Sequence, residues 1–287
     1  MTVTLSTRIG PGYFTTPTFE AMQFPAGEAH IKVINENDRK GPLTEIARVY
    51  GADGNDLMLL AMWADAAERR GARAILQMPY LPGARADHAD FIPLGAEVYA
   101  QFINALHVDQ VICFDPHSPA MPAMIEGVTV IDSTRLVREH VVGKRRDDRP
   151  QHYDGIIAPD KGAVERAQNV AIATHLPLYR AEKVRDQDTG KLSGFTCDPL
   201  PDEGRFLVVD DICDGGGTFA GLAKVIDKPG RRLGLYVSHG VFSGAAADIL
   251  PTWFSEIWTT DSFTAESTLG TRTNLIPLSR TLNGAIA

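Results

Sequence analysis

Six short apolar runs recur along the chain, and each of them ends in a polar or acidic residue. Their apolar residues stand at consecutive positions, whereas a strand with one face in water would alternate apolar and polar residues. This pattern predicts strands that are buried on both faces of a parallel sheet. The runs occupy residues 74–80, 111–115, 156–160, 206–211, 235–239 and 257–261.

Helical patterns stand between these runs. Apolar residues recur three and four positions apart within residues 57–64, 94–106 and 219–226. Alternation of strands and helices predicts an α/β fold. In such folds ligands bind beyond the carboxyl ends of the strands, so the polar residues that end the runs point toward candidate sites.

A charged stretch that ends in proline, residues 144–150 (KRRDDRP), reads as a linker because sheet-type patterns lie on both sides of it. We therefore predict two α/β domains, residues 1–145 and 146–287. The sequence leaves open that the last few residues pack back on the first domain.

Charge and composition make some kinds of binding partner and some classes of protein unlikely. The 287 residues include 28 basic and 36 acidic ones, which gives a net charge of −8 and makes nucleic acid and anionic membranes poor partners. Three cysteines are too few and too scattered for a disulfide framework. The sequence shows neither an apolar run of roughly 20 residues, as a membrane span needs, nor a signal peptide. We expect a cytoplasmic protein.

The segment that carries most chemistry is residues 206–218, FLVVDDICDGGGT, which runs into an apolar helical pattern. Glycines let backbone N–H groups converge on an anion, and the start of a helix adds positive potential. The three acids cannot bind phosphate, so sugar hydroxyls or hydrated Mg²⁺ are their natural partners. A phosphate site beside hydroxyl acceptors describes a ribose phosphate, whereas the simpler alternative is a glycine turn with solvated acids.

This segment resembles the ribose-phosphate binding motif of type I phosphoribosyltransferases and of the ribose-phosphate pyrophosphokinase (PRPP synthetase) family. Further segments resemble motifs of the pyrophosphokinases in the same order along the chain, from about Phe24 to Asp261. These segments are residues 24–28 (FPAGE), 79–88 (PYLPGARADH), 114–118 (FDPHS), 158–167 (APDKGAVERA), 182–185 (EKVR) and 238–244 (SHGVFSG).

The resemblance implies two phosphoribosyltransferase-like domains, each a parallel sheet flanked by helices, with ATP held by the first and ribose phosphate by the second. It implies transfer of the β,γ-diphosphoryl group of MgATP to the 1-hydroxyl of ribose 5-phosphate, with Mg²⁺ as the cofactor. It also implies a homo-oligomer, a dimer or a hexamer, because one adenine contact comes from a neighbouring subunit.

Residue roles also follow from the resemblance. Lys183 and Arg185 match the loop cations that stabilise the transferring phosphates, and His117 and Asp160 match the positions that hold the Mg²⁺ of ATP. The acids Asp210, Asp211 and Asp214 match the acceptors of the ribose hydroxyls, and Gly215, Gly216, Gly217 and Thr218 match the site of the 5-phosphate. The ATP-binding matches are Arg85, Asp87, Glu28 and His117.

Three departures mark an atypical member. Gly215 stands where the family usually has threonine, which could make room for a group attached to the 5-phosphate. After Arg85 no lysine or arginine occurs until Arg135, so the arginine-rich stretch of the family is missing. Ala26 replaces an adenine-contacting aspartate.

Alternatives remain open on the sequence. The same chemistry could act on ADP-ribose and give ADP-ribose 1-pyrophosphate, suited to NAD synthesis. The chain could also be a non-catalytic regulatory homologue, although Lys183 and Arg185 are retained, or a transferase that consumes PRPP. The sequence leaves the acceptor, the oligomer order, any allosteric control and the pathway undetermined.

Overall fold

The computed structural model describes residues 2–9, 13–15, 17–35, 43–51, 53–87, 93–143, 152–185, 192–264 and 273–287. The predicted linker at 144–150, the predicted domain boundary and His88 lie outside the described residues. The chain forms two compact units. The first comprises Met1–Ile131, Ser262–Thr264 and Leu278–Ala287, and the second comprises Asp132–Asp261 and Ala265–Pro277.

The first unit is built on a six-stranded sheet of order β2-β1-β5-β6-β7-β8. The strands from β5 to β8 are parallel, whereas β1 pairs antiparallel with β2 and with β5. A separate antiparallel hairpin, β3–β4, precedes β5. The strands are β1 (Val3–Ile9), β2 (Tyr13–Thr15), β3 (Phe19–Gln23), β4 (Ala29–Val33), β5 (Leu43–Val49), β6 (Arg73–Gln77), β7 (Gln110–Phe114) and β8 (Val128–Ile131).

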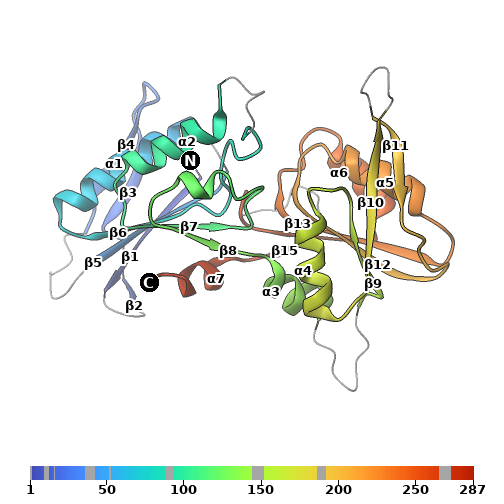
Figure 1. Cartoon of the computed structure of the whole chain (residues 1–287). Coiled ribbons are helices and arrows are strands. Elements are labelled where there is room, and N and C mark those ends of the chain that lie inside the picture. Colours follow the sequence, from blue (N-terminus) through green and yellow to red (C-terminus); the bar gives the residue numbers. More distant parts are fainter. Residues whose placement is uncertain are drawn as a thin grey trace. The chain divides into compact units, whose positions relative to one another are not determined.

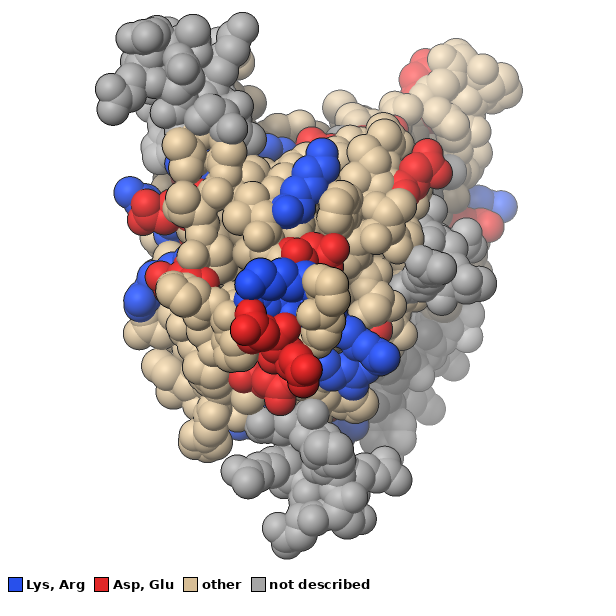
Figure 2. All heavy atoms as spheres, turned by 90° about the vertical axis from the view of Figure 1, so that its right-hand side faces the viewer, with Lys and Arg blue, Asp and Glu red and all other residues tan. Residues whose placement is uncertain are grey.

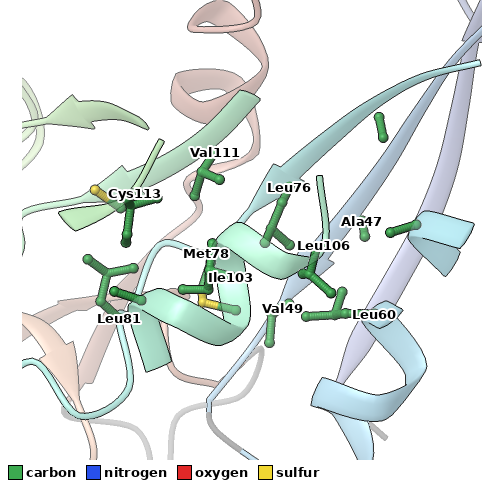
Figure 3. Close-up of a cluster of buried hydrophobic side chains, with 14 of the residues drawn as sticks. Ala47, Val49, Leu60, Leu76, Met78, Leu81, Ile103, Leu106, Val111 and Cys113 are labelled. Carbon is green, nitrogen blue, oxygen red and sulfur yellow. The ribbon is translucent and has the colours of Figure 1, made fainter. Parts of the chain in front are cut away.

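Two helices, α1 (Gly54–Arg69) and α2 (Gly95–Ala105), bury their apolar stripes against one face of this sheet. Figure 3 shows Leu60 and Ile103 of the two helices in one buried cluster with Leu76 and Ala47 of the sheet. Both helices lie where the spacing of apolar residues predicts them. Pro122–Met124 adds a short 3₁₀ turn.

The other face of the first sheet receives the last helix of the chain, α7 (Ser279–Gly284) (Figure 1). Leu278 and Leu282 are fully buried. Gln77 Nε2 donates to Asn283 Oδ1 at 2.9 Å. Gln110 Nε2 donates to the carbonyl of Ala285 at 2.9 Å. The final helix is therefore an integral part of the first unit.

The second unit is built on a seven-stranded sheet of order β11-β10-β9-β12-β13-β14-β15. All pairs are parallel except β10–β11. The strands are β9 (Gly155–Ala158), β10 (Leu178–Arg185), β11 (Leu192–Cys197), β12 (Gly204–Cys213), β13 (Arg231–Gly240), β14 (Glu256–Thr260) and β15 (Thr273–Ile276). The helices are α3 (Thr134–Leu136), which continues into a π-helical turn (Val137–Val142), α4 (Val164–Thr174), α5 (Gly217–Ile226) and α6 (Ala246–Trp253).

The strand order of the second sheet reverses at β9 and β12. The chain leaves β9 through α4 toward β10 on one side, and it leaves β12 through α5 toward β13 on the other side. Such a reversal opens a crevice outside the carboxyl ends of the two strands, where α/β proteins bind ligands. We call this place the carboxyl edge of the second sheet.

The predicted α/β class and all six predicted strands are confirmed, with two corrections. Both sheets carry antiparallel strands at one edge, so neither sheet is wholly parallel. In addition, β12 continues to Cys213, so Asp210 and Asp211 lie inside the strand and do not follow it. The ladder with β13 extends past them and fixes their direction.

None of the helices in the described ranges combines the length and the apolar character needed to cross a membrane. Figure 2 shows basic and acidic side chains interspersed on the face that it presents. Exposed ion pairs such as Lys228–Asp202, with Nζ and Oδ1 3.1 Å apart, agree with this mixed surface.

We predict that replacing the buried Leu282 by alanine destabilises the first unit by about 2–4 kcal/mol, because it leaves a cavity under the sheet. Urea unfolding of the full chain measures this loss. Val98→Ala is the control, since Val98 on α2 is 54% exposed and its loss should cost less than about 0.5 kcal/mol. Equal losses in the two variants would contradict the placement of α7.

Candidate active site

A glycine loop (residues 214–216) joins β12 to α5. Gly216 adopts φ +75°, and a Cβ there would lie 3.2 Å from two atoms of Leu250, so both conformation and space favour glycine. Gly215 and Gly217 are exposed, and a Cβ at either position would meet nothing within 4 Å. Their backbone is therefore open to a ligand at the start of α5, an arrangement that suits a phosphate.

Thr218 stands at the second position of α5. The residue before the helix is Gly216, and it makes no side-chain cap. The first turn of α5 is therefore uncapped by side chains at its start. This leaves its N–H groups directed toward the space in front of the glycine loop.

Two acids, Asp210 and Asp211, form what we call the acid pair near the end of β12. Their side chains are only 13% and 7% exposed. The backbone N–H of Asp211 donates to Oδ1 of Asp210 at 2.9 Å. Burial raises the pKa of Asp210 well above its ordinary value, and the carboxyl groups of Asp211 and Asp160 raise it further. Two carboxyl groups this close resist carrying two negative charges without a cation nearby.

Arg166 on α4 supplies that cation. Its Nη1 lies 3.9 Å from Oδ1 of Asp210 and 3.9 Å from Oδ1 of Asp211, and its side chain is only 12% exposed. We did not single out Arg166 from the sequence, although it lies inside the segment 158–167 that carries the family resemblance. A partly buried arginine beside two acids lowers the cost of their ionisation.

Lys183 and Asp160 form the second charged contact at this edge. Lys183 Nζ lies 2.7 Å from Oδ2 of Asp160. Oδ1 of Asp160 accepts the backbone N–H groups of Gly162 at 3.0 Å and Ala163 at 3.2 Å. Asp160 follows β9, and Lys183 belongs to β10, so the sheet order places the two side chains together. Arg185 is the last residue of β10, and its side chain lies outside the description.

Asp214 is exposed and is held by the loop that follows β13. The hydroxyl of Ser243 donates to Oδ1 of Asp214, and the N–H of Ser243 donates to the carbonyl of Asp214 at 3.2 Å. Phe242, at φ +51°, turns this loop back so that its N–H bonds to the carbonyl of Cys213 at 3.0 Å. Ser243 is a further residue that we did not single out, although it lies in the segment 238–244.

The candidate ATP residues lie in the first unit. Ser118 Oγ donates to Oδ2 of Asp87 at 2.5 Å, which ties the loop after β7 to the loop after β6. His117 and Arg85 are exposed on these same two loops. Glu28 is exposed in the turn between β3 and β4, where its carbonyl accepts the N–H of Phe24 at 2.9 Å. The structure thus brings the loops of Asp87 and His117 together.

The chemistry of the candidate metal ligands restricts the kind of metal site. Within the described ranges no three histidine, cysteine or acidic side chains gather as a metal cage. His117 and Asp160 belong to different units. Both oxygens of Asp160 already accept protein donors, so this carboxylate offers a cation only its remaining lone pairs. Such a donor set fits Mg²⁺ that keeps its waters and arrives on phosphate oxygens.

The cysteines do not add a nucleophile. Burial raises the pKa of Cys113 to about 12 and that of Cys213 to about 12, and it raises the pKa of Cys197 to about 11. These thiols stay protonated at neutral pH, and a protonated thiol is a weak nucleophile. The chemistry of the site therefore rests on its carboxylates, cations and backbone amides.

Comparison with known proteins identifies the class of the second unit first. Residues 132–254 match the family model described as the phosphoribosyl transferase domain. This range contains every candidate residue at the carboxyl edge of the second sheet. The phosphoribosyltransferase-like fold predicted for this half of the chain is confirmed.

Longer matches cover most of the chain. The chain is 29% identical over 270 residues to ribose-phosphate pyrophosphokinase of Bradyrhizobium diazoefficiens, covering 88% of this chain and 81% of the relative. It is 28% identical to the protein of that name from Vibrio parahaemolyticus, covering 96% of this chain and 88% of the relative. The predicted resemblance to this family is confirmed.

A solved structure shows the same fold. The crystal structure of phosphoribosylpyrophosphate synthetase from Mycobacterium smegmatis matches with a TM-score of 0.76 and 21% identity, covering 93% of this chain and 88% of that chain. The likeness extends across both units, so it supports the fold expected for the whole chain.

We predict that Asp210→Asn stabilises the second unit at pH 8. Because the pKa of Asp210 is raised in the folded protein, ionising this carboxyl lowers the free energy of unfolding. The loss begins as the pH rises above about 3.9, the pKa of an aspartate in an unfolded chain. It is complete once the pH exceeds the pKa of Asp210 in the folded protein. Removing the charge should raise the midpoint of thermal unfolding by about 2–4 °C for each kcal/mol regained.

The gain should shrink as the pH falls toward 4, because the wild-type carboxyl is then protonated. Asp202→Asn is the matched control, since its side chain is 86% exposed. Thermal unfolding of all three proteins at pH 4 and pH 8 measures the effect. A gain that is the same at both pH values would argue against a charge penalty at Asp210.

Proposed function

We propose that the protein transfers the β,γ-diphosphoryl group of MgATP to the 1-hydroxyl of a ribose 5-phosphate unit and releases AMP. With ribose 5-phosphate itself the product is PRPP. The name that the curated relatives carry supports this reaction. The single observation that carries the proposal is the carboxyl edge of the second sheet, where the Lys183–Asp160 pair, the acid pair and the glycine loop lie on the neighbouring strands β9, β10 and β12 or directly after them.

The acceptor binds at this edge through two complementary groups. The open backbone at Gly215 and Gly217, together with the start of α5, takes the 5-phosphate. The acid pair accepts hydrogen bonds from the ribose hydroxyls, and Arg166 offsets part of the cost of its negative charge. Ser243 orients Asp214 beside the loop. A sugar held at both ends presents its 1-hydroxyl in a fixed place, and such positioning supplies much of the rate of a group transfer.

The cations stabilise the charge of the transferring group. Lys183 is held by Asp160 before substrate binds, so its ammonium group needs little reorganisation to meet a phosphate oxygen. Arg185, two residues further along β10, is the second candidate cation. Arg85, Asp87, Glu28 and His117 are the candidate ATP-binding residues. Phosphoryl transfer of this kind depends mainly on placement and on charge neutralisation.

His117 in the first unit and Asp160 in the second are the candidate Mg²⁺ ligands, and water and ATP oxygens would complete the coordination. When bound, Mg²⁺ neutralises charge on the transferring phosphates. Because Asp160 also contacts Lys183, it would offer such a cation only its remaining lone pairs. Loss of activity in the presence of EDTA, reversed by added Mg²⁺, would support this requirement.

We predict that Lys183→Ala lowers kcat at least about 100-fold while the protein stays folded, since one lost cation in a preorganised site costs this much. AMP release from MgATP in the presence of ribose 5-phosphate measures the rate. Lys228→Ala is the control. Lys228 lies in the loop after α5 and pairs with the exposed Asp202, so this substitution should leave the rate unchanged. Equal activity of Lys183→Ala and the wild type would refute the assigned role.

ADP-ribose is the second candidate acceptor, and Gly215 is the observation that favours it. ADP-ribose is a ribose 5-phosphate that carries AMP on its phosphate, so it needs free space beside the glycine loop. Among the described residues, a Cβ at position 215 would meet nothing within 4 Å.

We predict that Gly215→Thr separates the two acceptors. The open space lets threonine fit without strain, so turnover of ribose 5-phosphate should stay within about threefold of the wild type. Turnover of ADP-ribose should fall about tenfold or more if its AMP part passes this position, since a displaced substrate loses rate steeply. Values of kcat/KM for each acceptor, with Gly215→Ala as a smaller substitution, measure the difference. An inert wild-type protein with both acceptors would leave the regulatory homologue as the better account.

A homo-oligomer, a dimer or a hexamer, is part of the same proposal. Glu28 is exposed at the tip of the β3–β4 hairpin, which presents its carboxylate outward. Sedimentation of the protein and of Glu28→Ala, combined with ATP affinity, tests whether this residue serves a neighbouring subunit.

A further inference from the structure

A close contact joins β11 to α5 in the second unit. The ring of Phe195 packs against Gly221, where a Cβ would lie 2.5 Å from Cε2, 3.2 Å from Cδ2 and 3.3 Å from Cζ of that ring. Phe195 is 8% exposed, so the ring is held in the core. Glycine weakens the interior of a helix relative to alanine, and here the close approach of the ring requires it. We call this contact the Phe195–Gly221 notch.

Lys183 is tied to this notch through the sheet. Phe195 on β11 is the direct partner of Lys183 on β10 in the antiparallel ladder. Directly opposed residues project their side chains from the same face of the ribbon, so a shift of one moves the other. The ladder continues through the pair Val184–Gly194 and becomes irregular between Val184 and Arg185. The notch therefore anchors the ribbon at the pair that includes Lys183, one pair before this irregularity.

The other side of the notch belongs to the candidate phosphate site. Helix α5 begins at Gly217, directly after the glycine loop, and Gly221 lies about one helical turn further along. Phe219 and Leu222 of the same helix are buried in the cluster that includes Phe195. A single packing contact thus connects the helix that starts at the glycine loop with the strand pair that carries Lys183.

We propose that the Phe195–Gly221 notch is a positioning contact that fixes Lys183 relative to the glycine loop. This inference rests on the proposed function, since it assigns Lys183 to the transferring phosphates. Phe195 touches no reacting atom. It acts by holding β10 in the register at which Lys183 Nζ lies 2.7 Å from Asp160 Oδ2. Glycine at position 221 is what lets the ring come close enough to do so.

The first test fills the notch. Gly221→Ala should push the ring away and displace Lys183, so kcat should fall about tenfold, as a small misplacement of a catalytic group does. The KM for ribose 5-phosphate should stay within about twofold, because the glycine loop and the acid pair are untouched. Phe195→Leu alone should give an intermediate loss of kcat, and it serves if Gly221→Ala does not fold.

The second test is suppression. In the double variant Gly221→Ala with Phe195→Leu, the shorter side chain makes room for the new methyl group, so kcat should recover to within about threefold of the wild type. A merely structural contact would instead lower stability in each variant without a selective change in kcat.

Gly234→Ala is the matched control in the same unit. A Cβ at Gly234 would clash with the ring of Tyr153 near the start of β13, at the opposite end of the sheet from the site. This variant should lower the midpoint of thermal unfolding while kcat of the folded protein stays unchanged. A fall in kcat as large as that of Gly221→Ala would overturn the proposal, as would an unaffected kcat in Gly221→Ala.

Hydrogen exchange gives a readout that does not depend on turnover. Gly221→Ala should speed the exchange of the amides of β10 and β11, with those of β13 and β14 unchanged. If the wild type releases no AMP, the proposed function fails and exchange alone decides whether the notch holds the ribbon. Unchanged exchange in β10 would then overturn the positioning contact.

Discussion

Two neighbouring carboxyl groups are confined near the end of β12, and the charged contacts of the candidate site are arranged around them. Asp210 and Asp211 are nearly buried, and the pKa of Asp210 is raised by burial and by its acidic neighbours. Arg166, reaching from α4, brings a positive charge to both of them. The protein thus tolerates an unfavourable pair of charges at the place where hydroxyl groups of a sugar would need acceptors. On the proposed function, this local loss of stability keeps the binding groups ready in advance.

Much of this arrangement could be predicted from the sequence, because its strands are apolar at consecutive positions and its motifs are local. The six runs predict the central strands, and residues 206–218 predict a loop before a helix. The end of β12 was harder to predict, since Asp210 and Asp211 look like a strand boundary, whereas the ladder with β13 continues to Cys213. The strands β1 to β4 had no apolar run that marked them, because they lie at an edge or in a separate hairpin.

Contacts between segments that are distant in the sequence could not be predicted, for a different reason. Arg166 and Ser243 lie inside segments that carry the family resemblance, yet nothing local shows that they face Asp210, Asp211 and Asp214. Their roles arise from the order of the strands, which sets the carboxyl ends of β9, β12 and β13 side by side. The same holds for Gly221. The sequence shows a glycine within a helical pattern, but the reason for it is visible only when the ring of Phe195 is seen to pack against it.

The return of the chain to the first unit has a consequence for how the protein is made. Leu278 and Leu282 fill one side of the first sheet, although the rest of that unit is encoded almost entirely before residue 132. Domains generally fold in order as they leave the ribosome. Here the first unit lacks Leu278 and Leu282, and the contacts of this segment with Gln77 and Gln110, until residues 278–287 have been synthesised. The nascent chain therefore carries an exposed apolar surface throughout the translation of the second unit, and it is a natural client for chaperones during that interval.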